Sequence, residues 1–101
     1  VVVKDGAVMA VEAIEGTDAC ILRGGQLARG GAVVAKAAKP QQDQRYDVPT
    51  VGPDTIQTMI KVGATAIVME AGKTFLFDAK ATAALADENG IAIVAKSLEA
   101  N

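Results

Sequence analysis

The alternation of helix and strand is clearest in Pro53-Asp-Thr-Ile-Gln-Thr-Met-Ile-Lys-Val-Gly-Ala-Thr-Ala-Ile-Val-Met-Glu70, the stretch that decides the fold class. Proline fits the first turn of a helix, so we predict a helix over Pro53–Val62 that Gly63 ends. The unbroken apolar run that follows predicts a strand over Thr65–Glu70. A helix joined to a strand by so short a connection is typical of packed α/β structure.

The same alternation continues on both sides of this stretch. At the start of the chain, Asp5-Gly6 lies between two apolar runs and favours a hairpin with a two-residue type I′ turn. The predicted order is ββαβ, a loop, then αββαβ, which makes a mixed α/β (α+β) domain with a mixed sheet. The other expected elements are strands Val1–Lys4 and Ala7–Ile14, a helix to about Ala28 capped by Thr17 or Asp18 and closed by Arg29-Gly-Gly31, strand Ala32–Ala38, strand Thr74–Phe77 returning after the turn Ala71-Gly-Lys73, helix Ala79–Glu88 capped by Asp78, and strand Ile91–Lys96.

A possible internal pseudo-repeat relates the two halves of the chain. The run Gly30-Gly-Ala-Val-Val-Ala-Lys36 matches Gly90-Ile-Ala-Ile-Val-Ala-Lys96, and Val11-Glu-Ala13 matches Met69-Glu-Ala71. Each half would then be a hairpin, a helix and a strand that ends in Ala-Lys. Convergence of two alanine-rich ββα units on similar residues is the alternative explanation.

Composition narrows the class of protein. The chain has 101 residues, which is enough for a single domain over residues 1–101 with its own core. Half of the residues are hydrophobic but only 3% are aromatic, so alanine and valine must fill most of the core. A net charge of −2 excludes a broad basic surface for nucleic acid, and we expect no nucleic-acid partner. Because the chain opens on Val1 directly in a strand, we expect it to be the end of a longer protein.

The available side chains also limit the chemistry. Histidine is absent, so acid–base or metal chemistry must use carboxylates, lysine or tyrosine. The single Cys20 lies in an apolar helix, where a small core side chain is the expected role. No apolar run approaches the roughly 20 residues of a membrane span.

The segment Lys39–Gly52 is the strongest candidate for a functional loop. It carries two acids and two bases between prolines, with no apolar periodicity. In an extended conformation Asp43, Arg45 and Asp47 point to one side. Two acids flanking an arginine could hold Mg²⁺ while Arg45, with Lys39, binds a phosphate. The alternative is a solvated, charge-balanced linker.

Further candidates lie at the ends of the expected strands. Alternation places Val8, Ala10, Glu12 and Ile14 on one face of a strand, and Ala66, Val68 and Glu70 on one face of another, with Lys36 and Lys96 as candidate partners of the acids. Both acids could equally reach solvent. The junction Glu15-Gly-Thr-Asp18 could hold a phosphate or a metal-bound water at a helix N-terminus, or be an ordinary capped turn. The run Ala71-Gly-Lys-Thr74 lacks the glycine spacing of a P-loop and precedes a strand.

Several motifs together resemble one family. They are Glu12-Ala, Glu15-Gly-Thr-Asp18, Lys39-Pro-x-Gln-Asp43-x-Arg45-x-Asp47-x-Pro49-x-Val-Gly52, Thr55-Ile56 and Glu70-Ala-Gly-Lys-Thr74. Over nearly its whole length the chain is similar to the C-terminal domain of the LpxI family of UDP-2,3-diacylglucosamine pyrophosphatases. Tyr46 stands where we expect the family's phenylalanine. The resemblance implies metal-dependent hydrolysis of the pyrophosphate bond of UDP-2,3-diacylglucosamine to lipid X (2,3-diacylglucosamine 1-phosphate) and UMP in lipid A biosynthesis.

The resemblance also implies roles for single residues and partners. It implies a lipid nucleotide-sugar substrate, Mg²⁺ or Mn²⁺ as cofactor, an N-terminal Rossmann-like domain absent from this chain, a possible homodimer, and a cytoplasmic location peripheral to the inner membrane. The alternative is a non-catalytic module that binds a nucleotide-sugar or lipid and mediates dimerisation, or a purely structural domain. The implied site residues are Asp43 and Asp47 for catalysis and, with Asp18, for the metal, and Lys39, Arg45, Thr17, Lys73, Thr74, Glu12 and Glu70 for the substrate.

Overall fold

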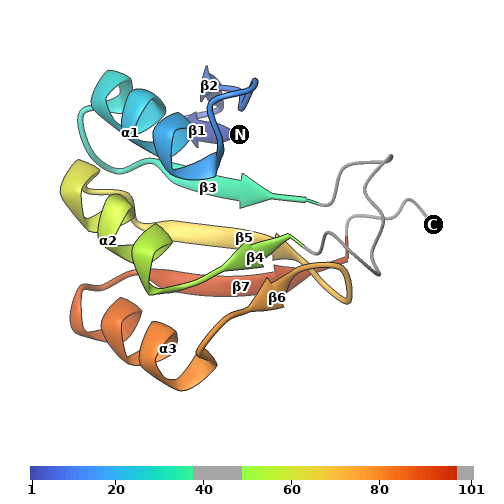
Figure 1. Cartoon of the computed structure of the whole chain (residues 1–101). Coiled ribbons are helices and arrows are strands. Elements are labelled where there is room, and N and C mark those ends of the chain that lie inside the picture. Colours follow the sequence, from blue (N-terminus) through green and yellow to red (C-terminus); the bar gives the residue numbers. More distant parts are fainter. Residues whose placement is uncertain (38–48, 98–101) are drawn as a thin grey trace.

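A mixed sheet covered on one face by helices forms the domain (Figure 1). The computed structural model describes residues 1–37 and 49–97. Within these residues, five strands form the main sheet in the order β2-β1-β3-β5-β7, and two short strands form a second sheet, β4-β6. The elements are β1 (Val2–Lys4), β2 (Ala7–Ala10), α1 (Thr17–Ala28), β3 (Val33–Lys36), β4 (Thr50–Val51), α2 (Pro53–Val62), β5 (Ala66–Glu70), β6 (Phe75–Leu76), α3 (Ala79–Glu88) and β7 (Ala92–Lys96).

The strand directions place all three helices on one face of the main sheet. Strand β1 runs antiparallel to both β2 and β3, whereas β3, β5 and β7 are mutually parallel. Helices α1, α2 and α3 connect successive strands that step across the sheet in one direction. Right-handed connections of this kind bring the helices to the same face, where Figure 1 shows them side by side. The predicted mixed α/β class with a mixed sheet is confirmed.

The opening hairpin forms as predicted, but its second strand is shorter. Asp5 and Gly6 both have positive φ, 52° and 76°, as a type I′ turn requires. Strand β2 ends at Ala10, and the pairing shifts between Val2 and Val3. Because of this shift Ala10 is buried whereas Val8 is 62% exposed. The prediction that these two residues share a face with Glu12 and Ile14 is therefore wrong.

Small side chains let the helices pack closely on the sheet. On the face toward the helices, Val34 and Ile67 are buried against residues such as Ile56. Full burial of one aliphatic side chain of this size stabilises a fold by about 1.5–3 kcal/mol. A Cβ atom added to Gly24 in α1 would lie 2.6 Å from the Cβ of Val2, so this helix sits almost directly on β1.

The helix boundaries were predicted better than the helix caps. Helix α2 spans Pro53–Val62 and ends at Gly63, whose φ of 69° is left-handed, as predicted. Neither Thr17 nor Asp18 caps α1, because Gly16 occupies the N-cap position with a φ of 92°. Asp78 is the N-cap residue of α3 but makes no side-chain capping hydrogen bond. Both helices therefore begin without a side-chain cap.

The internal pseudo-repeat is not confirmed. The residues predicted to return as a hairpin after β5 instead form β6, which pairs in parallel with β4 in the second sheet. The first half has no counterpart of this arrangement, because β1 and β2 pair with each other inside the main sheet. Strand β4 was not predicted, since a two-residue strand carries too little periodicity to recognise.

Candidate functional site

Several polar side chains lie at the carboxyl ends of the parallel strands, at one edge of the main sheet. Strands β3, β5 and β7 end at Lys36, Glu70 and Lys96, and α1 and α2 begin at this same edge. In open α/β sheets, ligands bind outside the carboxyl ends of the strands. The segment that contains Asp43 and Asp47 joins β3 to β4, so it connects to the described structure at this edge.

A threonine links a base and an acid from three different elements. The Lys36 Nζ donates a hydrogen bond to the Thr17 Oγ1 at 2.8 Å. The same hydroxyl donates to the Glu12 Oε1, also at 2.8 Å. The hydroxyl thus holds a cation and a carboxylate about one side chain apart, at the start of α1. Sequence reasoning named Lys36 as a partner of the strand-end acids, and the structure connects it to Glu12 through Thr17.

The segment between β2 and α1 is held in place by an arginine. The Arg23 Nη2 donates to the Val11 carbonyl at 3.0 Å and to the Glu15 Oε1 at 2.8 Å. The backbone N–H of Ala13 donates to that same Glu15 oxygen at 3.2 Å. Val11 and Ala13, which these hydrogen bonds hold, are the neighbours of Glu12 in sequence. The bonds therefore help to orient the Glu12 carboxylate toward Thr17. The guanidinium hydrogen bond, and then the Ala13 N–H, hold the pKa of Glu15 below its ordinary value.

Replacing Arg23 by glutamine should raise the pKa of Glu15, because its main stabilising donor is lost. A pKa that is low in the folded state adds stability above the unfolded pKa, and this is lost as the pH falls through the folded value. The variant should therefore show a weaker loss of stability on acidification in this range. NMR titration of the Glu15 carboxyl group measures the shift, with the exposed Lys61→Gln as control. An unchanged Glu15 pKa would contradict the assignment.

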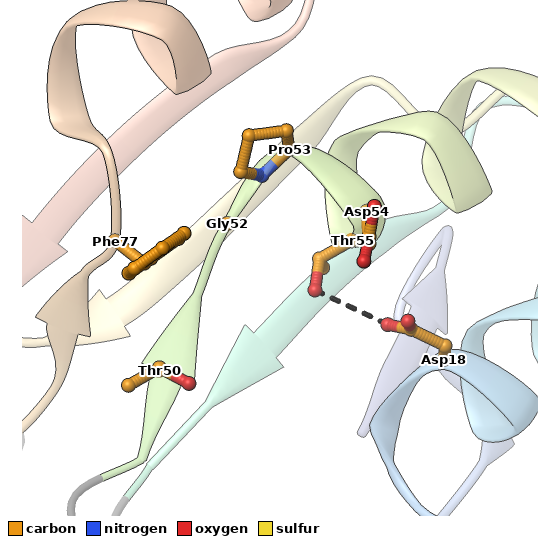
Figure 2. A pocket seen from close by; sticks show the side chains of 7 residues that line it. All are labelled: Asp18, Thr50, Gly52, Pro53, Asp54, Thr55 and Phe77. Carbon is orange, nitrogen blue, oxygen red and sulfur yellow. Dashed lines mark hydrogen bonds between the residues drawn. The ribbon is translucent and has the colours of Figure 1, made fainter.

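An open cavity of about 360 Å³ lies between the first turns of α1 and α2 and the second sheet (Figure 2). The Thr55 Oγ1 donates to the Asp18 Oδ1 at 3.1 Å and so connects the two helix starts. The ring of Phe77, which is 60% exposed, forms the opposite wall. Its Cδ1 would lie 3.4 Å from a Cβ atom at Gly52, so a larger residue there would crowd the ring. The remaining lining residues are Thr50, Pro53 and Asp54.

The other predicted residues at the edge form a separate group. The Lys73 Nζ lies 3.7 Å from the Glu70 Oε2, and Glu70 is only 8% exposed. Lys96 is the cross-strand neighbour of Glu70 on β7. The Thr74 hydroxyl is buried and has no hydrogen-bond partner in the part of the chain described. Thr74 is not among the residues that line the cavity, and its predicted role in substrate binding stays a prediction.

The predicted loop residues cannot be placed in the site. Lys39, Asp43, Arg45 and Asp47 lie outside the described residues. Among residues 1–37 and 49–97, no group of three or more acidic, cysteine or histidine side chains is arranged to hold a metal ion. None of the described helices combines the length and the apolar character needed to cross a membrane.

Sequence reasoning gave no site role to four of the residues that line the cavity, namely Pro53, Asp54, Thr55 and Phe77. Asp54 and Thr55 belong to the first turn of α2, and Phe77 follows β6. A polar pair directly after the helix-starting Pro53 was a usable signal, because the first turn of a helix presents unpaired N–H groups. Phe77 had no such signal, since its position depends on the unpredicted pairing of β4 with β6. Burial raises the pKa of the Cys20 thiol, and Cys20 is part of the core, as expected.

The comparisons with known proteins agree on one family. The model of the LpxI C-terminal domain matches residues 1–94. The chain is 44% identical over 101 residues to a protein of Caulobacter vibrioides named UDP-2,3-diacylglucosamine pyrophosphatase LpxI. This alignment covers 92% of the chain but 36% of the relative, so the chain spans about a third of the length of that relative.

Proposed function

This chain belongs to the LpxI C-terminal domain family, and from that premise we propose that the protein hydrolyses the pyrophosphate bond of UDP-2,3-diacylglucosamine. The products would be 2,3-diacylglucosamine 1-phosphate and UMP, in the synthesis of lipid A. A water oxygen bonds to one phosphorus atom while the bond from that phosphorus to the bridging oxygen breaks. The chain would supply the C-terminal part of the enzyme, with an N-terminal domain supplying the rest.

One observation carries this proposal beyond the family match. The cluster Lys36–Thr17–Glu12 lies at the carboxyl edge of the sheet, next to the connection that bears Asp43 and Asp47. The ammonium group of Lys36 has three N–H donors and could bond to a phosphate oxygen while it keeps its bond to Thr17, whereas the single O–H of Thr17 would have to leave Glu12 to do so. Thr17 accepts from Lys36 and donates to Glu12, so the three side chains fix one another. A pyrophosphate bound here would meet groups whose orientation is already set.

The roles of the loop residues complete the proposal. Arg45 and Lys39 would bind phosphate, and Asp43 or Asp47 would be the essential acid. Glu70 and Lys73 would border the substrate from the end of β5, where their side chains lie 3.7 Å apart. Since Glu70 is almost fully buried, we expect it to hold Lys73 in place toward the phosphates.

A divalent metal ion is part of the proposal. The carboxylates of Asp18 and Asp54 line the cavity, and oxygen donors of this kind suit Mg²⁺ and Mn²⁺. Asp18, together with Asp43 and Asp47, would hold the ion. When bound, it would supply positive charge that polarises a phosphoryl oxygen. Thr55 keeps the Asp18 carboxylate oriented through their 3.1 Å hydrogen bond.

The lipid part of the substrate requires an apolar surface near the site. Phe75 and Phe77 are 53% and 60% exposed, and Phe77 lines the cavity. Transfer of acyl chain onto such a surface contributes about 0.8 kcal/mol per buried CH₂ group. We propose that the enzyme works at the cytoplasmic face of the inner membrane as a peripheral protein, because its substrate resides in the bilayer.

The test is product analysis with the full-length protein and UDP-2,3-diacylglucosamine. We expect ³¹P NMR to show UMP and a sugar 1-phosphate, with the activity abolished by a chelator and restored by Mg²⁺ or Mn²⁺. Reaction in H₂¹⁸O shows which phosphorus atom the water attacks. Release of UDP in place of UMP, or no turnover with either metal, would overturn the proposal and favour the non-catalytic binding module.

A further inference from the structure

The main sheet has a second face that no described element covers. Within residues 1–37 and 49–97, the three helices all pack on the other face (Figure 1). On the uncovered face, paired residues of neighbouring strands form an aliphatic row across the whole sheet. From β2 to β7 this row consists of Val8, Val3, Val33, Ala66 and Ala92. We call this surface the open sheet face.

A second row runs beside the first. It consists of Ala35, Val68 and Val94 on β3, β5 and β7. Val94 is 45% exposed, and Val8 at the far edge of the first row is 62% exposed. The two rows contain no polar side chain and no aromatic ring. A contiguous apolar patch that extends over all five strands is often an interaction site.

The strand sequences themselves are of the type that is buried on both sides. Parallel sheets occur almost only with both faces covered, and their strands are then continuous apolar runs. Strand β5 begins Ala-Ile-Val-Met and β7 begins Ala-Ile-Val-Ala, with no alternation of polar residues. A face meant for solvent would place polar side chains at every second position. We infer that the open sheet face is covered in the working protein.

The size of the open sheet face limits what can cover it. Four strand spacings of about 4.8 Å and two residue steps of about 3.3 Å, with the side-chain margins, give on the order of 300 Å². Two copies packed face to face would bury roughly 600 Å², well below the ~1,200–2,000 Å² of stable complexes. A partner in the same polypeptide needs less area, because its effective concentration is in the millimolar range.

The length of the relative supplies such a partner. The alignment covers 36% of the Caulobacter vibrioides protein, so most of that polypeptide lies outside the matched region. We therefore propose that the open sheet face docks the part of the full-length polypeptide that these 101 residues do not include. This proposal rests on the domain organisation put forward above but not on the reaction. A lipid surface is a poorer fit, because the two rows lack the aromatic and basic residues typical of membrane-binding faces.

The open sheet face also leads to the candidate site. Glu70 is on the same side of β5 as Ala66 and Val68, at the carboxyl end of that strand. A domain packed on the two rows would therefore reach the edge where Glu70 and Lys73 lie. The covering part would form one wall of the substrate cleft, and Glu70 would lie at the boundary between the two parts.

Cysteine accessibility in the full-length protein tests the proposal. Val8→Cys places a thiol on the open sheet face, and Leu27→Cys places one on α1; both side chains are 62% exposed in this domain. Reaction with a maleimide, followed by peptide mass spectrometry, measures the rate at each position. Native Cys20 is buried and is resolved as a separate peptide. We expect position 8 to react at least about tenfold more slowly than position 27, at every protein concentration.

Each other outcome contradicts the proposal in a different way. Equal rates at positions 8 and 27 would mean that nothing selectively covers the open sheet face. Protection that disappears on dilution, together with a dimer-to-monomer change in sedimentation, would assign the face to a second copy. Protection that requires added phospholipid vesicles would assign it to a membrane. The test measures the accessibility of thiols and not pyrophosphatase activity. Its result therefore stands even if the proposed reaction is wrong.

Discussion

Full-length protein with Asp43→Ala or Asp47→Ala is expected to lose at least about 100-fold in kcat in one of the two variants, and to stay folded. A factor of 100 corresponds to about 2.7 kcal/mol of transition-state stabilisation, which is typical for a lost catalytic carboxylate. The two acids flank Arg45 at alternate positions, in the segment that connects to the carboxyl edge of the sheet. Steady-state hydrolysis of UDP-2,3-diacylglucosamine at saturating metal ion measures the effect.

The control for this experiment is Asp87→Ala. Asp87 is an exposed acid in α3, so its loss removes the same charge without touching the carboxyl edge. We expect its kcat to equal that of the unaltered protein. Circular dichroism establishes that each variant is folded. Full activity in both the Asp43 and the Asp47 variant would remove the loop from the catalytic assignment and favour the binding module, for which these acids are dispensable.

The second large effect concerns the contact between α1 and α2. A Cβ atom added to Gly25 would overlap the Cβ and Cγ2 atoms of Val62, so Gly25→Ala must push the two helices apart. Alanine is favoured over glycine inside a helix by about 1 kcal/mol, but overpacking a close contact costs about 1–3 kcal/mol or more. We therefore expect a net loss of stability, seen as a lower Tm in calorimetry of the full-length protein.

Two further variants separate the steric cause from others. Gln26→Ala alters the next residue of the same helix, which is exposed, and should change the free energy of unfolding by less than about 0.5 kcal/mol. Val62→Ala combined with Gly25→Ala should recover part of the loss, because it removes the two methyl groups that crowd the new side chain. A stabilised Gly25→Ala variant would show that the helices are not held this closely.

The Gly25→Ala substitution should also affect the cavity, because α1 and α2 both line it. The contact at Gly25 joins α1 to α2 near their C-terminal ends, and the hydrogen bond from Thr55 to Asp18 joins them at their N-terminal ends. Moving the helices apart would therefore lengthen the distance across the cavity. If the cavity takes part in binding, Gly25→Ala should also raise KM for the substrate.

Local rules were sufficient for much of the fold. The sequence by itself determined the type I′ turn at Asp5-Gly6, because few residues other than glycine and asparagine or aspartate accept two consecutive positive φ angles. It determined the first and last residues of α2 and α3, because proline favours the first turn of a helix and glycine favours the position after its end. The presence of Glu12, Thr17 and Lys36 near strand and helix ends was also apparent from the chain alone.

Only the tertiary structure decided which of these residues meet. The pairing of β6 with β4 in place of β5 depends on contacts between segments far apart in sequence, which no local pattern encodes. The register shift next to Val3 turned Val8 to the open sheet face and Ala10 to the core, since one extra residue reverses the direction of every following side chain. The two hydrogen bonds that link Lys36, Thr17 and Glu12 form because α1 leads the chain to β3, the strand beside β1. The packing of α1 against the sheet fixes this path.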